Sequence, residues 1–288
     1  MTTRSTGLAG EHTVRTAMIM GLPFSVHLRS RSRPLHHRTA ASEAVDVPAV
    51  DAAVAAVWDS LRWADRVFST YRPDSDVSRI RRGELSVRDA DPAVAQVLDF
   101  AEIARRLTGG AFDVVGRRGH GRSSLDPSGI VKGWAASRAA AALGSLDMDY
   151  YFNAGGDVLL RSADVEQTWR IGIEHPDDPQ GLLAVVELAT GAVATSGRTH
   201  RGEHIWNPAT GRPAAGVAQA TVVGPSLVWA DILATAVIAG GLERLDIEQW
   251  PPGHDVLLVT DDGAVLATAG FTQRFADDVP PPPFSLLS

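Results

Sequence analysis

The sequence predicts an α+β protein in which helices dominate the first half of the chain and strands the second half. Residues 47–68 and 92–109 both place apolar side chains at helical spacing, and each stretch carries proline in its first turn. Short strand-like runs follow one another from residue 150 to residue 223 without helices between them. Because no strand–helix–strand repeat is present, this order favours an α+β fold over a doubly wound parallel sheet.

The other elements can be assigned in the order of the chain. Residues 14–29 have the alternation of a strand, which could form a hairpin with residues 35–46. The expected helices cover residues 47–68, 92–109, 130–143, 226–241 and 242–249. The expected strands cover residues 150–153, 158–161, 169–174, 182–188, 192–195, 219–223, 255–260 and 264–268. We therefore expect a mostly antiparallel sheet with packed helices.

The domain organisation is simple. Residues 13–275 contain no Gly-, Pro- or Ser-rich linker and are expected to form one continuous domain. Residues 1–12 are polar, and residues 276–288 contain four consecutive prolines, Pro280 to Pro283. Such segments do not form packed elements by themselves, so we expect both ends to be disordered.

Composition excludes several classes of protein. Of the 288 residues, 44% are hydrophobic and 21% are charged, as in ordinary globular domains. The net charge of −7 argues against a nucleic-acid-binding surface, and we interpret the one Arg-rich stretch, Arg29–Arg33, as a solvated hairpin loop. The chain has no cysteine, which excludes disulfides, thiolate metal sites, a cysteine nucleophile and a lipid anchor on cysteine.

Membrane association is not indicated. No signal peptide is visible, and no apolar run reaches the length of a membrane span. Residues 226–241 are apolar at eleven of sixteen positions, but they include Asp231, which favours a helix buried inside the protein. We expect a cytoplasmic protein without a direct membrane anchor.

Two segments carry the chemistry that defines the candidate site. Asp231 and Thr235 lie four residues apart, on one face of the apolar helix. A lone carboxylate there is costly unless something pairs with it, and Mg²⁺ takes carboxylate, hydroxyl, carbonyl and phosphate oxygens. On spacing alone, the alternative is a buried Asp bonded to backbone amides, with the Thr hydroxyl bonded to its own helix.

The second segment runs from Leu125 to Gly133 and places Asp126 and Lys132 near the start of the helix at 130–143. A helix N-terminus and a lysine together favour a phosphate, and Asp126 could accept from a ribose or adenine group. The alternative is a surface salt bridge of little energetic weight. With Asp231, this segment indicates a Mg²⁺-dependent site for a diphosphate-bearing ligand.

Two further motifs suit a nucleotide that contains flat rings. Thr108–Asp113 contains Gly109 and Gly110, which can end a helix and also permit close approach of a ligand. Ala111, Phe112 and Asp113 could then hold an adenine end. Tyr71 offers an aromatic face for stacking, although it could equally be a turn residue ahead of Pro73. No Gly-x-Gly-x-x-Gly motif is present, so a Rossmann site is not supported.

These motifs, taken in order, resemble those of the FAD:protein FMN transferase family, also called the ApbE family. The resemblance covers roughly residues 14–270. Its pieces are Met20-Gly21, Phe68–Asp76, Thr108–Asp113, Leu125–Gly133, Asn153–Asp157, Ala194–Gly197, His204–Gly211 and Ala230–Ala236. The resemblance implies a T-fold-like α+β enzyme that transfers the FMN moiety of FAD to a Ser or Thr hydroxyl of a partner flavoprotein and releases AMP.

The resemblance also implies roles for individual residues. The metal ligands would be Asp231, Thr235 and the carbonyl of Gly129. Lys132 would act on the phosphates, and His204 would lie near the transferred phosphoryl group, where a neutral imidazole can take a proton. The implied FAD-binding residues are Met20, Tyr71, Ala111, Phe112, Asp113, Asp126, Lys132 and Ile205.

One residue departs from the family pattern. The family usually has Asp where this chain has Asn207. Asn keeps the hydrogen-bonding shape and loses the charge, so activity could be lowered or retuned. Two alternative functions stay open at this point: hydrolysis of FAD to FMN and AMP, and flavin binding without catalysis.

Overall fold

The computed structural model of the protein describes residues 12–31, 46–118, 122–197 and 205–287. Within this part of the chain, a nine-stranded sheet has the order β1-β2-β5-β6-β9-β12-β13-β14-β15. Its strands are β1 His12–Ile19, β2 Leu22–Ser30, β5 Met148–Ala154, β6 Asp157–Arg161, β9 Thr190–Gly197, β12 Val217–Gly224, β13 Asp255–Thr260, β14 Val265–Ala267 and β15 Ser285–Leu286. All neighbouring pairs are antiparallel except β14 and β15. The prediction of an α+β fold with a mostly antiparallel sheet is confirmed.

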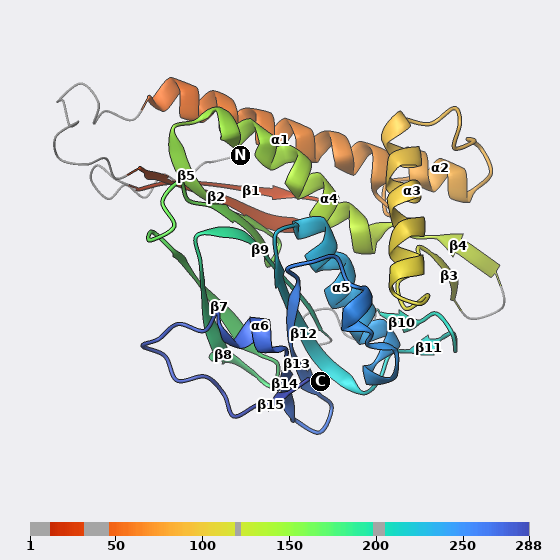
Figure 1. Ribbon diagram of the computed structural model, residues 1–288. Helices are drawn as coiled ribbons and strands as arrows, with labels where there is room; N and C mark the ends of the chain where they lie inside the picture. The colour runs from red at the N-terminus through yellow and green to blue at the C-terminus, as the bar shows by residue number, and fades with distance from the viewer. Residues whose placement is uncertain (1–11, 32–45, 119–121, 198–204, 288) are drawn as a thin grey trace.

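Helices cover one face of this sheet, as Figure 1 shows. The helices of the described residues are α1 Val47–Phe68, α2 Asp76–Arg81, α3 Pro92–Leu107, α4 Ser128–Ala140, α5 Leu227–Gly240 and α6 Ala269–Thr272. The long helices α1, α4 and α5 share one hydrophobic core with side chains from the strands, among them Phe24, Phe152 and Val222. Helix α6 lies outside this layer, next to β13, and its Phe271 is part of a second hydrophobic core.

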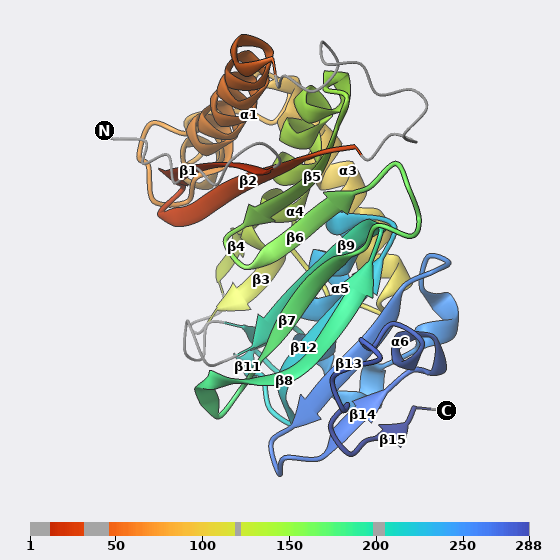
Figure 2. The same ribbon diagram turned by 90° about the vertical axis from the view of Figure 1, so that its left-hand side faces the viewer.

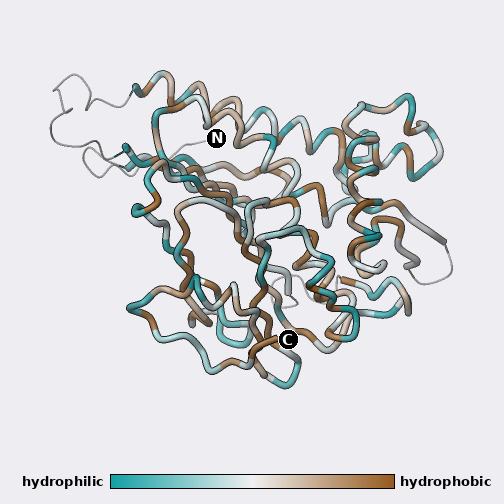
Figure 3. Tube along the Cα trace, viewed as in Figure 1, coloured by the Kyte–Doolittle hydropathy of each residue, from teal (hydrophilic) through white to brown (hydrophobic). Residues whose placement is uncertain are grey.

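A separate hairpin covers the other face of the sheet. It consists of β7 Trp169–His175 and β8 Asp178–Leu188, which pair with each other (Figure 2). Ile171 and Ile173 of β7 pack against Leu160 and Val193 in a second, smaller hydrophobic core. The sheet is thus apolar on both faces, and Figure 3 shows hydrophobic segments in its strands and hydrophilic ones in the peripheral loops.

Capping residues account for where α1, α3 and α5 begin. The Asp46 carboxylate accepts from Ala49 N at 3.0 Å at the start of α1, and Asp91 does the same for Ala93 N at 2.9 Å at the start of α3. Ser226 caps α5, which ends at Gly241 with φ 65°. Helix α5 is buried on nearly all sides, as expected for an internal helix. No helix in the described residues is long and apolar enough to cross a membrane.

Two sequence-based assignments are wrong. Residues 14–29 hold parts of two strands, because Met20 and Gly21 both adopt positive φ, 55° and 70°, and form a tight hairpin turn. Residues 32–45, which include most of the strand partner expected at 35–46, lie outside the described residues. The helix expected at 242–249 is two 3₁₀ turns, since Leu245 between them is extended.

Several short elements were not predicted at all. They are α2, α6, β3 Val115–Arg118, β4 Arg122–Leu125, β10 Trp206–Asn207, β11 Arg212–Pro213 and β15. Arg29 and Arg31 also differ from the solvated loop expected for them. Arg29 lies 4.2 Å over the Trp169 ring, and both guanidinium groups lie 3.4 Å from the buried carboxylate of Asp149.

The C-terminal segment also differs from the disordered tail that we expected. Ser285 and Leu286 pair with Leu266 and Ala267 of β14, and Leu287 N donates to Ala267 O at 2.8 Å. The edge of the sheet supplies backbone partners that the proline-rich sequence cannot supply itself. Residues 1–11 and residue 288 lie outside the described residues.

Candidate functional site

A cavity of about 920 Å³ opens where the helical layer meets the ends of the central strands. Its walls come from the β1–β2 turn, the loop after α1, the start of α4, the β5–β6 turn, β7, β9, β10 and α5. The predicted site residues that line it are Met20, Tyr71, Ala111, Phe112, Asp113, Asp126, Gly129, Lys132, Ile205, Asp231 and Thr235. The fold therefore brings together every predicted site residue that the structure describes. His204, the predicted base, lies outside the described residues.

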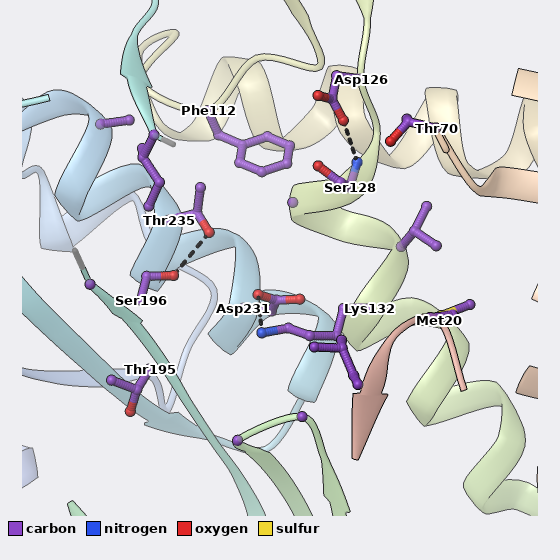
Figure 4. Close-up of a pocket in the computed structure, with 18 of the residues that line it drawn as sticks. Met20, Thr70, Phe112, Asp126, Ser128, Lys132, Thr195, Ser196, Asp231 and Thr235 are labelled. Atoms are coloured by element: carbon purple, nitrogen blue, oxygen red, sulfur yellow. Dashed lines mark hydrogen bonds and ion pairs between the residues drawn. The ribbon is translucent and has the colours of Figure 1, made fainter. Parts of the chain in front are cut away.

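Asp231 and Thr235 face this cavity from successive turns of α5 (Figure 4). The Thr235 hydroxyl lies 3.1 Å from the Ser196 hydroxyl on β9. Gly129 is close by, because a Cβ added to it would lie 3.7 Å from the Thr235 methyl group and 3.1 Å from the Phe112 ring. The three residues proposed as metal ligands therefore lie together, although they come from two separate helices.

Asp231 is buried against α4, with 3% of its surface exposed. Its Oδ2 accepts from Gly133 N at 3.0 Å, and its Oδ1 lies 3.6 Å from Lys132 Nζ. A Cβ on Gly133 would lie 2.9 Å from the Leu227 carbonyl oxygen and 3.2 Å from Asp231 Oδ2. Glycine at 133 is thus what lets the two helices approach closely enough for this contact.

Burial dominates the electrostatics of Asp231. It raises the pKa of this carboxyl to about 7, opposed by the Lys132 ammonium and reinforced by the negative charge of Asp157. Lys132 Nζ lies 2.6 Å from Asp157 Oδ2, so one ammonium is shared between two buried carboxylates. Such a site favours the arrival of additional positive charge.

The donor set fits a hard divalent cation that is completed by a ligand. Asp231 offers a carboxylate, Thr235 a hydroxyl and Gly129 a backbone carbonyl, all of them oxygen donors that Mg²⁺ accepts. The described residues include no cluster of three or more His, Cys, Asp or Glu side chains that could hold a metal. A cation at Asp231 would therefore need water or ligand phosphate oxygens as well, as is usual for Mg²⁺.

One end of the cavity is shaped by the segments expected to hold adenosine. Thr108 Oγ1 donates to Ala104 O at 2.8 Å and accepts from Phe112 N at 3.0 Å, so the turn both ends α3 and positions Phe112. Asp113 Oδ1 accepts from Val115 N at 2.7 Å. Asp126 Oδ1 accepts from Ser128 N at 3.2 Å, which orients the carboxylate at the mouth of α4.

Tyr71 and Met20 line the cavity from outside the helical layer. The Tyr71 side chain is 96% exposed, so an aromatic face is available beside the opening. Its loop is fixed by Ser69, whose Oγ accepts from Tyr71 N and Arg72 N, each at 3.3 Å. Met20 is placed by the strained turn between β1 and β2.

Asn207 lines the cavity but is occupied by its own turn. Its Oδ1 accepts from Ala209 N at 2.9 Å and from Thr210 N at 3.3 Å. These bonds need only an acceptor oxygen at this position, which Asn and Asp both supply.

Sequence reasoning missed three contributors to the site. Asp157 and Ser196 occur in motifs that we quoted but to which we gave no role. The third is the part of β7 from Gly172 to Glu174, which lines the cavity and is tied to β12 by Gln219 Nε2, a donor to Glu174 O at 2.9 Å. An acidic residue directly after Gly155-Gly156 could have pointed to Asp157, whereas nothing in the sequence places the hairpin here.

Comparison with known proteins agrees with this geometry. A model of the ApbE family matches residues 20–118 and 117–258. The chain belongs to the ApbE family. Its membership explains why motifs far apart in the sequence line a single cavity.

Individual ApbE relatives support the same conclusion. An FAD:protein FMN transferase of Rhodobacter capsulatus is 31% identical over 201 residues, which are 64% of this chain and 37% of the relative. This chain therefore spans well under half the length of that protein.

Solved ApbE structures share the fold. The ApbE protein of Thermotoga maritima superposes with a TM-score of 0.73 at 21% identity, covering 96% of this chain and 100% of that one. The flavin transferase ApbE of Vibrio cholerae gives 0.71 at 23% identity, covering 92% and 99%. The flavinyl transferase ApbE of Pseudomonas stutzeri gives 0.71 at 22% identity, covering 94% and 100%.

Proposed function

We propose that this protein transfers the FMN moiety of FAD to a Ser or Thr hydroxyl of a partner flavoprotein, in a Mg²⁺-dependent reaction that releases AMP. The proposal rests on membership of the ApbE family and on the named activity of the Rhodobacter capsulatus relative. The observation that supports it for this chain is a cavity lined by the Lys132 ammonium, by the oxygen donors of Asp231 and Thr235, and by the exposed Tyr71 ring.

The reaction balances as one displacement at phosphorus. The acceptor hydroxyl oxygen forms a bond to the FMN phosphorus, and the bond from that phosphorus to the bridging oxygen breaks. AMP leaves with the bridging oxygen. The hydroxyl proton passes to a base, for which we propose His204.

Each predicted site residue that the structure describes has a proposed task in this reaction. Lys132 would bind the diphosphate, while Asp231, Thr235 and the Gly129 carbonyl would hold Mg²⁺. The cation, when bound, supplies charge neutralisation at the phosphates. Ala111, Phe112, Asp113 and Asp126 would hold the adenosine half, and Met20, Tyr71 and Ile205 the flavin half.

Incubation with FAD, MgCl₂ and a candidate acceptor protein tests the proposal, with mass spectrometry of the products. Transfer is shown by an acceptor heavier by one FMN, together with AMP. Free FMN and AMP without an adduct would indicate hydrolysis, and unchanged FAD would indicate a flavin-binding protein without catalysis. EDTA should stop the reaction and added MgCl₂ should restore it, whereas full activity in EDTA would exclude the metal requirement.

A further inference from the structure

We infer that Asp157 is a positioning residue, which holds the Lys132 ammonium away from Asp231 and so keeps Asp231 open to a divalent cation. This inference rests on the proposed cation site at Asp231. It assigns a role to the Asn153–Asp157 motif, to which we gave none from the sequence.

Asp157 lies behind the cavity and not in its lining. It is only 1% exposed, at the start of β6, and it is not among the residues that form the cavity wall. A carboxylate so deeply buried is costly unless charge and hydrogen bonds compensate it. Its Oδ1 accepts from Thr195 N at 3.3 Å, and its Oδ2 lies 2.6 Å from Lys132 Nζ.

The turn before Asp157 is built to fix this position. Asn153 Oδ1 accepts from Gly156 N at 3.0 Å, and Gly155 N donates to Pro23 O at 3.0 Å. Gly155 and Gly156 have backbone φ angles of 64° and 102°, which residues other than glycine rarely adopt. The carboxylate thus accepts from Thr195 N of β9, while the turn before it is tied to β5 through Asn153 and to β2 through Pro23.

Lys132 lies unequally between the carboxylates of Asp157 and Asp231. Its ammonium lies 2.6 Å from Asp157 and 3.6 Å from Asp231, so Asp157 is the nearer carboxylate. A cation bound to Asp231 Oδ1 would be repelled by any ammonium that moved closer. Because the repulsion of two positive charges grows steeply as they approach, the position of Lys132 bears directly on cation affinity.

Binding of Mn²⁺ alone, measured by electron paramagnetic resonance of the free ion, tests the inference without FAD or turnover. Mn²⁺ takes the same oxygen ligands as Mg²⁺. In Asp157→Asn, the amide oxygen can still accept from Thr195 N, but the charge that attracts Lys132 is gone. We expect Mn²⁺ affinity to fall by about tenfold, the order expected when an ammonium shifts towards a neighbouring carboxylate.

The double variant separates positioning from a merely structural role. Adding Lys132→Met to Asp157→Asn removes the competing ammonium and should restore Mn²⁺ affinity to at least the wild-type value. Unchanged affinity in Asp157→Asn, or a double variant that stays weak, would overturn the inference. If Asp157→Asn alone does not fold, Lys132→Met and the double variant should bind Mn²⁺ equally, and weaker binding by the double variant would overturn it.

Asp149→Asn is the matched control. Asp149 is also 1% exposed and also pairs with cationic side chains, Arg29 and Arg31, but these partners do not line the cavity, whereas Lys132 does. The Asp149→Asn protein should bind Mn²⁺ with the same affinity as the wild type. If wild-type protein binds no Mn²⁺ or Mg²⁺, the proposed metal site itself fails, which is a different outcome from wild-type binding that Asp157→Asn leaves unchanged.

Discussion

The Ser196 hydroxyl lies 3.1 Å from the Thr235 hydroxyl, across the gap between β9 and α5. A hydroxyl that binds a cation uses an oxygen lone pair, so its proton must be directed elsewhere. Ser196 Oγ lies within hydrogen-bond distance, so it could accept a hydrogen bond from a Thr235 hydroxyl whose lone pair faces a cation. The sheet thus contributes to a site whose proposed ligands all come from helices.

Replacing Ser196 by Ala should weaken Mn²⁺ or Mg²⁺ binding by about tenfold, the lower end of the effect of losing a supporting contact to a metal ligand. Calorimetric titration with MgCl₂ measures it. Ser145→Ala is the control, because the exposed Ser145 donates its hydroxyl to Ala142 O and does not line the cavity. Equal affinity in Ser196→Ala and Ser145→Ala would show that Thr235 needs no such partner.

Replacing Gly133 by Ala should destabilise the protein by about 1–3 kcal/mol, as overpacking does. Alanine ordinarily favours a helix over glycine, so the expected sign is opposite to that of propensity. The reason is that the new Cβ would lie 2.9 Å from Leu227 O and 3.1 Å from Asp231 Cβ. Urea unfolding measures the change.

Gly144→Ala is the control for this prediction. A Cβ at 144 would find its nearest neighbour, Arg161 Nη1, at 4.0 Å, so unfolding should be unchanged or slightly more difficult. A Gly133→Ala protein as stable as Gly144→Ala would mean that α4 and α5 can separate at little cost.

The fold was largely predictable because its signals are local. Helix α1 begins and ends where apolar spacing and Pro48 indicate, and most strands match their alternating runs. The β1–β2 hairpin was missed because Met20 adopts a positive φ that its sequence does not announce. The β15 strand was missed because its stability comes from the edge of β14 and not from its own residues.

The sequence could indicate which residues gather around one cavity, but not the contacts among them. Asp231 and Lys132 were found from spacing and family motifs. Their sharing of charge with Asp157 depends on contacts between α4, α5 and β6, which are distant in sequence. Only packing determines those contacts.

Stability should fall as the pH drops below about 6.5, the ordinary His value, because His27 resists protonation in the folded protein. Burial first, and then the positive charge of His12, lower the pKa of His27. The ring packs edge-on against Tyr151, and its Nε2 lies 3.0 Å from Ser25 Oγ. Below the unfolded-state pKa the unfolded chain binds more protons, so it is favoured.

Thermal unfolding between pH 5 and pH 8 checks this, with His27→Gln as the comparison. The variant lacks the titrating group but can still form a hydrogen bond with Ser25. Its melting temperature should therefore depend less on pH over this interval than that of the wild type. If the melting temperature changed with pH equally in the two proteins, the acid sensitivity would belong to groups other than His27.

Asn207→Asp restores the residue that is usual in the ApbE family. We expect its transfer rate to stay within about threefold of the wild-type rate, because a carboxylate keeps the same local bonds to backbone amides. Asn207 Oδ1 accepts from Ala209 N and Thr210 N, and these bonds account for the side chain without any part in proton transfer. Asn207→Ala removes both bonds and should lower the rate by loosening the turn that follows β10. Both variants can be compared in the FAD and acceptor assay by mass spectrometry.

A rise of tenfold or more in Asn207→Asp would mean that the missing negative charge limits catalysis. It would support the view that this protein has a lower turnover than relatives with Asp at this position. A flat result in Asn207→Asp, with a loss in Asn207→Ala, would make Asn207 a turn residue and remove the sequence feature that supports a flavin-binding protein without catalysis.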